Sequence, residues 1–154
     1  MRSFALAALL LLGSATLQAQ YSTVKKTEPR KWGSAPAAFP KGAQMAVVSG
    51  DPAQPAEFTV ELMMPDGYRI PPHFHPTDES VEVKKGTFLV GMGDTLDLTK
   101  TNAMKPGDKG KTPAEAHHYG VAKGSTVVSV TAIGPFAMTY VNLKDDPRTA
   151  QQQQ

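Results

Sequence analysis

All four histidines of this 154-residue chain lie in two short clusters. His73 and His75 are two residues apart, and residues i and i+2 of an extended chain face the same side, so both imidazoles can point into one cavity. If the residues after His75 form a turn into a neighbouring strand, the carboxylate of Glu79 returns beside the two rings. His117 and His118 begin a later predicted strand, where only one of two adjacent side chains can face inward. Three imidazole nitrogens and one carboxylate oxygen suit a first-row divalent metal and leave coordination positions open. The alternative from the residues alone is that these are separate surface or core histidines.

The elements that must position these side chains are short strands. Residues 57–64 alternate between apolar and polar side chains, and this period of two predicts a half-buried strand with Phe58, Val60, Leu62 and Met64 on one face. The same reasoning predicts strands over residues 45–48, 79–84, 87–90, 126–132 and 136–143. No segment of ten or more residues shows a helical period. The 13 glycines and 13 prolines are also typical of strands joined by turns. We therefore expect an all-β sandwich or barrel.

The charge and cysteine content narrow the possible functions. Sixteen basic and 14 acidic residues give a formal net charge of +2, and the basic residues are scattered, which argues against nucleic acid as a partner. The chain has no cysteine, so disulfides, thiol chemistry and thiolate metal sites are excluded. No serine or threonine lies in a pattern typical of an activated nucleophile. No residue is identified as a catalytic acid or base.

Composition divides the chain into four segments. Residues 1–19 combine a positive start with a short apolar run and small residues, which predicts a secretory signal peptide and a periplasmic or secreted protein. Nine or so apolar residues cannot span a bilayer core of about 30 Å, so we expect no stable membrane insertion after the signal is cleaved. Residues 20–43 are interpreted as an extended arm that packs on the barrel or on a second subunit, residues 44–148 as the folded domain, and residues 149–154 as a disordered tail.

The first histidine cluster resembles the first conserved motif of the cupin superfamily. That motif is Gly, five residues, His-x-His, three or four residues, Glu, six residues and Gly. The chain matches it at every position, with Gly67, His73, His75, Glu79 and Gly86. The glycines bracket the segment that presents the ligands, where tight turns require positive φ.

The second cluster resembles the second cupin motif with two departures. That motif is Gly, five residues, Pro-x-Gly, two residues, His, three residues and Asn. Gly107 and Pro113 match, Glu115 replaces the second Gly, and Ala122 replaces the Asn. This register selects His118 as the ligand and places His117 outward. Because Glu115 replaces a turn glycine, the turn could be reshaped or the ligand register shifted by one.

The resemblance extends over residues 30–148 and is to exported bacterial single-domain cupins, a group with no settled reaction. It implies an all-β cupin, a jelly-roll-like β-barrel of two antiparallel sheets. It also implies that His73, His75, Glu79 and His118 hold one divalent ion: iron, manganese, nickel, copper or zinc. Among cupins, dioxygenases and isomerases acting on small organic molecules are common, so a small metalloenzyme is the leading hypothesis. The alternative is a non-catalytic module that binds or senses a small ligand such as a sugar or organic acid. A homodimer is expected from the same resemblance.

Overall fold

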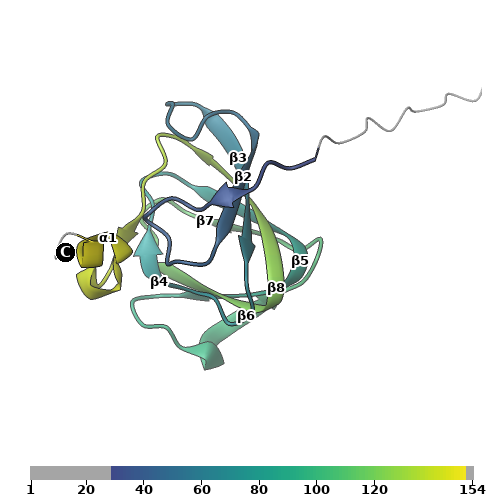
Figure 1. Cartoon of the computed structure of the whole chain (residues 1–154). Coiled ribbons are helices and arrows are strands. Elements are labelled where there is room, and N and C mark those ends of the chain that lie inside the picture. Colours follow the sequence, from purple (N-terminus) through teal and green to yellow (C-terminus); the bar gives the residue numbers. More distant parts are fainter. Residues whose placement is uncertain (1–28, 152–154) are drawn as a thin grey trace, which may run out of the picture.

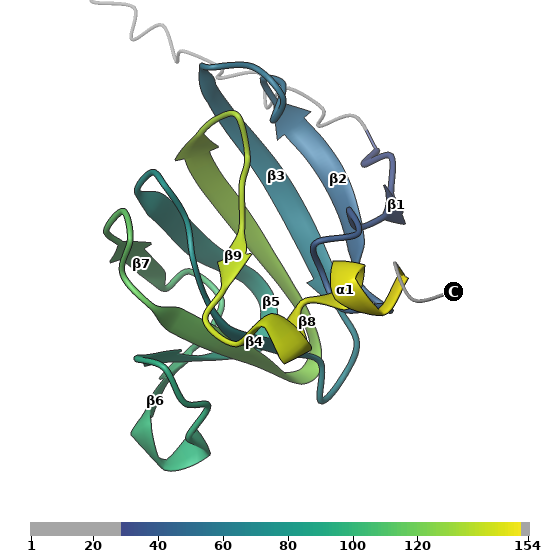
Figure 2. The same cartoon turned by 90° about the vertical axis from the view of Figure 1, so that its left-hand side faces the viewer.

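The computed structural model describes residues 29–151, and nearly all of its regular structure is β (Figures 1 and 2). The predicted signal peptide lies outside the described residues. Two 3₁₀ turns, Leu98–Lys100 and Leu143–Asp145, and one short helix, α1 (Pro147–Gln151), accompany the strands. The strands are β1 (Gly33–Ser34), β2 (Gln44–Ser49), β3 (Glu57–Met64), β4 (Arg69–Phe74), β5 (Glu79–Met92), β6 (Thr101–Met104), β7 (Lys109–Thr112), β8 (His118–Ile133) and β9 (Thr139–Tyr140).

The strands form a curled antiparallel barrel in which two long strands belong to both walls. β8 pairs with β3 through its second half, where Val60 is opposite Val130, and with β4 through its first half, where His73 is opposite His118. β5 pairs with β8 along nearly its whole length and also with β6 and β7. The two antiparallel layers expected from the sequence are therefore present, and they share continuous hydrogen bonding through β5 and β8.

Gly86 lies where β5 bends from one wall to the other. The sequence predicted two strands with Gly86 between them, whereas the structure has one strand whose register shifts on both sides of Lys85. Gly86 has a φ of +77°, and a Cβ atom there would lie 2.5 Å from the carbonyl oxygen of Ser125. Glycine is required because the bend brings two backbones into direct contact.

The core lies inside the barrel and is built from the inward faces of the strands. All four residues assigned to one face of β3 are buried: Phe58, Val60, Leu62 and Met64. Val83, Val128 and Val130 contribute from β5 and β8. The strands predicted from the alternation of apolar and polar residues are thus confirmed. Burial of their apolar faces is the main force that closes the barrel.

The part of the N-terminal arm that the structure describes packs on the barrel. β1 pairs with β2, and Arg30 donates two hydrogen bonds to Glu61 on β3, at 2.9 and 3.0 Å. Phe39 is buried, whereas Trp32 is only partly buried. Tyr68 and Tyr140 donate their hydroxyl protons to backbone carbonyls of the arm.

The C-terminal segment differs from the expected tail. Disorder was predicted from residue 149, but Thr149 belongs to α1 and its hydroxyl donates to the carbonyl of Asp146 at 2.8 Å. The helix forms because Asp146 accepts the backbone N–H of Arg148 and because Pro147 has its φ preset at the first helical position. Within residues 29–151, no helix is long and apolar enough to cross a membrane.

Candidate metal centre

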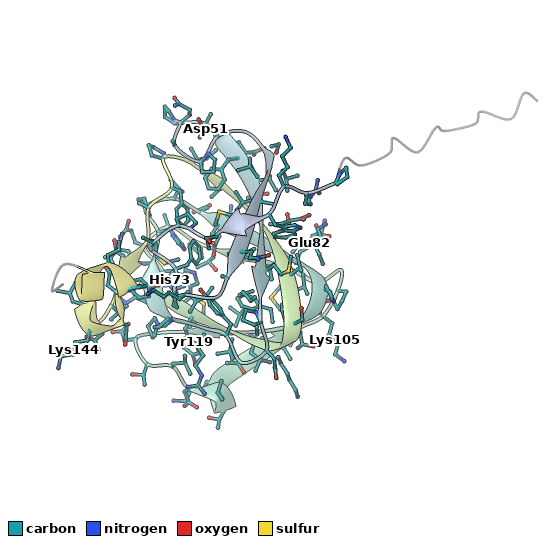
Figure 3. The ribbon with its side chains drawn as sticks, viewed as in Figure 1. Asp51, His73, Glu82, Lys105, Tyr119 and Lys144 are labelled. Carbon is teal, nitrogen blue, oxygen red and sulfur yellow. The ribbon has the colours of Figure 1, made fainter. Side chains whose placement is uncertain are left out.

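Three elements bring the sequence-predicted site residues together. His73 lies on β4 and His75 just after it, Glu79 is the first residue of β5, and His118 is the first residue of β8. The pairing of β4 with β8 places His73 directly opposite His118. Figure 3 shows His73 within the barrel, whereas Lys105 and Lys144 lie on its outside. All three histidines of the cluster are buried, with exposed fractions of 4 to 6%.

The backbone orients all three imidazoles in the same sense. The Nδ1 atoms of His73, His75 and His118 lie 2.7, 2.7 and 2.9 Å from the carbonyl oxygens of Pro71, Ala137 and Ala116. A carbonyl oxygen can only accept, so each Nδ1 carries the proton and each neutral ring presents an unprotonated Nε2. Metal-binding histidines commonly have this arrangement because the second hydrogen bond fixes the tautomer and the ring orientation.

The free ring nitrogens converge on one point. One nitrogen from each of the three rings lies within 4.8 Å of the others, and the ring centroids are 4.2 to 5.4 Å apart. The Nε2 atoms of His75 and His118 are buried and have no hydrogen-bond partner within the described chain. An unsatisfied buried polar atom costs free energy, so two of them pointing to the same spot fit a site built for a cation.

Glu79 completes the set on one side. Its carboxylate oxygens lie 3.6 Å from Nε2 of His75 and 3.3 Å from Nε2 of His118. Its side chain is 14% exposed. The structure therefore brings together all four residues selected from the sequence, and their donor set of three imidazoles and one carboxylate suits a first-row divalent ion.

Burial and mutual proximity shape the charges of this group. Burial, followed by the nearby His118 and His75, lowers the pKa of His73 to about 3, so that this ring is neutral at neutral pH. Burial alone would raise the pKa of Glu79, but the surrounding histidines outweigh it and lower that pKa. Burial would likewise lower the pKa of His118, yet the Glu79 carboxylate raises it. Glu79 is thus favoured as a carboxylate and His73 as a neutral imidazole, the protonation states that metal binding requires of these two ligands.

His117 points away from this cluster, as the motif register predicted. Its ring stacks on Phe74, with centroids 5.0 Å apart, and its Nδ1 lies 2.6 Å from a carboxylate oxygen of Asp94. Glu115 adopts a φ of +62°, the left-handed conformation that the glycine of the motif would adopt. The departure at position 115 therefore leaves the turn and the register of His118 intact.

The two motifs are also joined by hydrogen bonds. The backbone N–H of Glu115 donates to the carbonyl of His75 at 2.8 Å. The preceding N–H, that of Ala114, donates to the Asp78 carboxylate at 2.9 Å. These bonds hold the loop before His118 against the segment that carries His75 and Glu79.

A cavity of about 550 Å³ lies beside the cluster, and His73, Glu79 and His118 form part of its lining. Further walls come from residues that the sequence did not mark as part of a site: Phe39 of the arm, Met104 on β6 and Thr112 on β7. Residues 101–104 and 109–112 are too short and too polar to show a period of two, and Phe39 is an isolated aromatic among prolines and small residues. No sequence signal marked these residues as part of a site.

Comparison with known proteins gives matches in structure only. No protein-family model matches the chain, and no curated protein matches it. The solved structures do contain similar folds. The polyketide cyclase RemF from Streptomyces resistomycificus is similar over 85% of this chain and 92% of its own, with 20% identity and a TM-score of 0.65. An RmlC-like cupin from Shewanella frigidimarina is similar over 75% of this chain and 91% of its own, with 15% identity and a TM-score of 0.55.

A third similar structure is a variant of salicylate 1,2-dioxygenase from Pseudoaminobacter salicylatoxidans, in complex with gentisate. It covers 64% of this chain and 29% of its own, with 14% identity and a TM-score of 0.53. At these levels of identity the likeness concerns the fold. The curled antiparallel barrel and its structural neighbours together show that this chain has the cupin fold.

Proposed function

We propose that the chain is an exported cupin that holds one divalent transition-metal ion through His73, His75, Glu79 and His118 and acts as a small metalloenzyme. The observation that carries this proposal is the convergence of two buried Nε2 atoms, those of His75 and His118, beside the largely buried carboxylate of Glu79; neither nitrogen has a hydrogen-bond partner among the described residues. Such a group is costly to bury without a ligand, and a cation satisfies all of its free lone pairs at once.

The bound ion would supply either Lewis-acid polarisation or activation of oxygen. The chain itself contributes the ligand set, the backbone carbonyls that orient the rings, and the cavity beside the site. Dioxygenase or isomerase chemistry on a small organic molecule is the proposed reaction class. The similar structures support this class because they include a dioxygenase in complex with gentisate and an oxalate oxidase.

A non-catalytic binding module is the second candidate, and one observation favours it. The titratable side chains that line the cavity, apart from the metal group, are engaged elsewhere. The hydroxyl of Tyr119 donates to the carbonyl of Asp97, and Asp108 accepts the backbone N–H of Lys105. No free acid or base lines the described cavity, so any catalysis would depend on the metal and its own ligands.

One experiment separates the two candidates. The protein is purified from its own compartment, its metal is identified by elemental analysis, and oxygen uptake is measured against catechols, thiols and keto acids. Redox-active iron or copper with substrate-dependent oxygen consumption supports the enzyme. Tight ligand binding without turnover supports the binding module, and protein that takes up none of the five metals contradicts both.

Export and dimerisation are part of the proposal and rest on the sequence and the fold. Expression of the full chain should yield a mature protein that begins near Gln20, which mass spectrometry of the periplasmic or secreted fraction would detect. Retention of the first 19 residues would contradict export. Size-exclusion chromatography with light scattering should give twice the mass of one mature chain, and a purely monomeric species would contradict the dimer.

A further inference from the structure

The cavity beside the candidate metal centre has an apolar interior. Three phenylalanine rings line it, those of Phe39, Phe88 and Phe136. Aliphatic walls come from the inner faces of β3, β4 and β8, where Val60, Leu62, Ile70, Val128 and Val130 are all buried. Its polar lining consists of the metal group, the buried Thr112 and Tyr119, and residues of the exposed rim such as Asn102, Lys109 and Lys111. The hydroxyl of Tyr119 is already bonded to the carbonyl of Asp97.

The positive charges near the cavity are already paired. Each of the three lysines on its lining has its ammonium nitrogen 2.7 to 3.6 Å from a carboxylate oxygen. The pairs are Lys100 with Asp97, Lys109 with Glu82, and Lys111 with Asp78. These ammonium groups are largely exposed, with side-chain exposures of 63 to 77%, so they lie at the rim rather than in the interior.

None of the arginines between residues 29 and 151 lines the cavity. Arg30 is bound to Glu61 on the outer side of β3, Arg148 is bound to Asp146 near α1, and Arg69 is exposed. A carboxylate placed inside the cavity, away from the metal, would therefore have no cation to pair with. Burying an unpaired charge or an unsatisfied hydroxyl is strongly unfavourable.

We infer that the cavity binds a molecule with an apolar, ring-bearing body and a single metal-binding oxygen group, rather than a dicarboxylate or a polyhydroxylated acid. The oxygen group reaches the histidine end, and the rings are buried against the aromatic and aliphatic walls. This inference rests on the proposed function for the role of the metal. The preference for an apolar body follows from the lining alone.

Three carboxylates with different bodies provide the test: one with a fused aromatic ring system, one with a second carboxylate and one with several hydroxyl groups. Zinc-loaded protein is titrated by calorimetry with 2-naphthoate, glutarate and gluconate, because zinc is redox-silent and accepts nitrogen and oxygen ligands. We expect 2-naphthoate to bind at least about tenfold more tightly than the other two. Equal affinities, or tighter binding of glutarate or gluconate, would overturn the inference.

Two substitutions on β5 test whether the body occupies this cavity. Val90 lines the cavity, whereas its neighbour Leu89 points to the other face of the strand and does not. Val90→Phe should weaken 2-naphthoate binding by at least about tenfold, and the matched control Leu89→Phe should change it by less than about twofold. Met104→Phe, at a partly buried lining position on β6, is a second filling variant in case Val90→Phe fails to fold. Unchanged affinity in a folded, cavity-filled variant would place the ligand elsewhere.

The experiment separates failure of the inference from failure of the proposed function. The number of zinc ions bound per chain is measured for each protein before titration. It should be one in the parent and remain one in Val90→Phe and in Leu89→Phe. If no zinc binds, the proposed metal site is wrong, and the apolar preference is then tested on metal-free protein with neutral 2-naphthol. Binding of 2-naphthol that Val90→Phe abolishes would still support the inference, and its absence would overturn it.

Discussion

Phe39 of the N-terminal arm stacks on Phe136 of the segment between β8 and β9, with ring centroids 5.8 Å apart and an interplanar angle of 7°. Both rings line the cavity beside the candidate metal centre. Phe136 in turn lies 5.5 Å, centroid to centroid, from the ring of His75. The arm thus forms part of the cavity wall, and Phe136 connects it to the metal group.

We predict that Phe39→Ala lowers the free energy of unfolding by about 3 kcal/mol, because it removes a buried ring and leaves a cavity against Phe136. Chemical denaturation would measure the change. Phe39→Leu keeps most of the apolar volume and serves as the control, with an expected loss of about 1 kcal/mol. A loss below about 1 kcal/mol for Phe39→Ala would mean that the arm contributes little to the fold.

The two adjacent histidines at 117 and 118 should behave differently. His118→Ala and His75→Ala each remove a converging Nε2 atom, so bound zinc should fall well below one per chain. His117→Ala should leave zinc near one per chain, because that ring faces Asp94 and Phe74 outside the cluster. Elemental analysis after dialysis would measure the stoichiometry. The opposite result for positions 117 and 118 would refute the proposed ligand set.

The candidate site could be predicted from the sequence because its residues lie on well-patterned segments. His73 and His75 are two residues apart, which places their side chains on the same side of any extended chain. Glu79 lies four residues after His75, close enough in sequence to return to the same site after a turn. The family motif was needed to select His118 over His117. Its register is kept despite the Glu at position 115, because Glu115 adopts the positive φ that a glycine would have there. A glutamate in the left-handed region could not have been anticipated from residue preference alone.

Several elements of the fold could not be predicted, for identifiable physical reasons. β4 contains two consecutive prolines, which ordinarily argue against a strand, and its register with β8 shifts between Ile70 and His73 to accommodate them. The strand predicted over residues 136–143 is reduced to β9, because residues 143–145 turn to lead into α1. α1 itself depends on the cap and ion pair of Asp146, which a short polar tail does not reveal.

Substitutions at Glu115 test whether the turn of the second motif requires a residue that can adopt a positive φ. Glu115→Gly should retain zinc binding and match or exceed the stability of the parent, because glycine adopts a φ of +62° without steric cost. Glu115→Val should lower the free energy of unfolding by about 1 to 2 kcal/mol, since a β-branched residue is strained in that region. Thermal unfolding and zinc titration would measure both variants. If Glu115→Val proved as stable as Glu115→Gly, the positive φ at this position would be in question.

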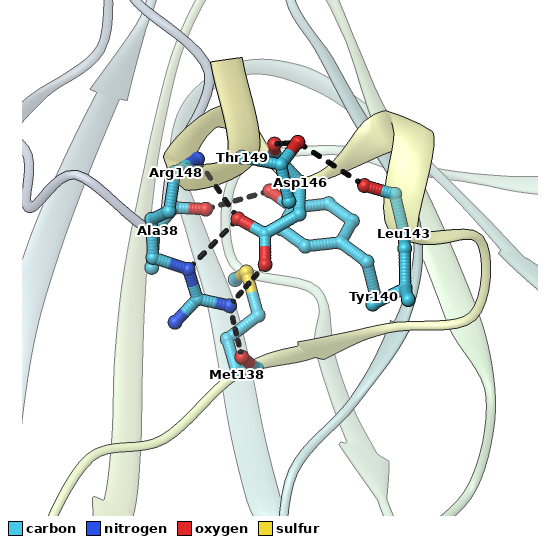
Figure 4. A network of polar contacts seen from close by, with 7 residues as sticks. All are labelled: Ala38, Met138, Tyr140, Leu143, Asp146, Arg148 and Thr149. Atoms are coloured by element: carbon cyan, nitrogen blue, oxygen red, sulfur yellow. Dashed lines mark hydrogen bonds and ion pairs between the residues drawn. The ribbon is translucent and has the colours of Figure 1, made fainter. Parts of the chain in front are cut away.

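The C-terminal helix is held to the barrel by one ion-paired arginine (Figure 4). Arg148 donates to both carboxylate oxygens of Asp146, at 2.8 and 2.7 Å, and to the carbonyl of Met138 at 3.0 Å. Met138 lines the cavity, so the pair anchors the segment behind it. Arg148→Ala should therefore destabilise the protein by about 1 kcal/mol, less than a buried pair would, because the Arg148 side chain is 42% exposed.

The same pair predicts a pH dependence of stability. The hydrogen bond from Arg148 holds the pKa of Asp146 below its usual value, so the folded state favours the ionised carboxylate. Its contribution is fully present above the unfolded pKa of about 3.9 and is lost as pH falls through the lower folded pKa. Asp146→Asn and Arg148→Ala should both lose less stability than the parent between about pH 5 and pH 2. Urea denaturation at several pH values in this range would measure the free energy of unfolding of each protein. If the free energy falls equally with pH in the parent and in Arg148→Ala, the pair does not contribute to acid sensitivity.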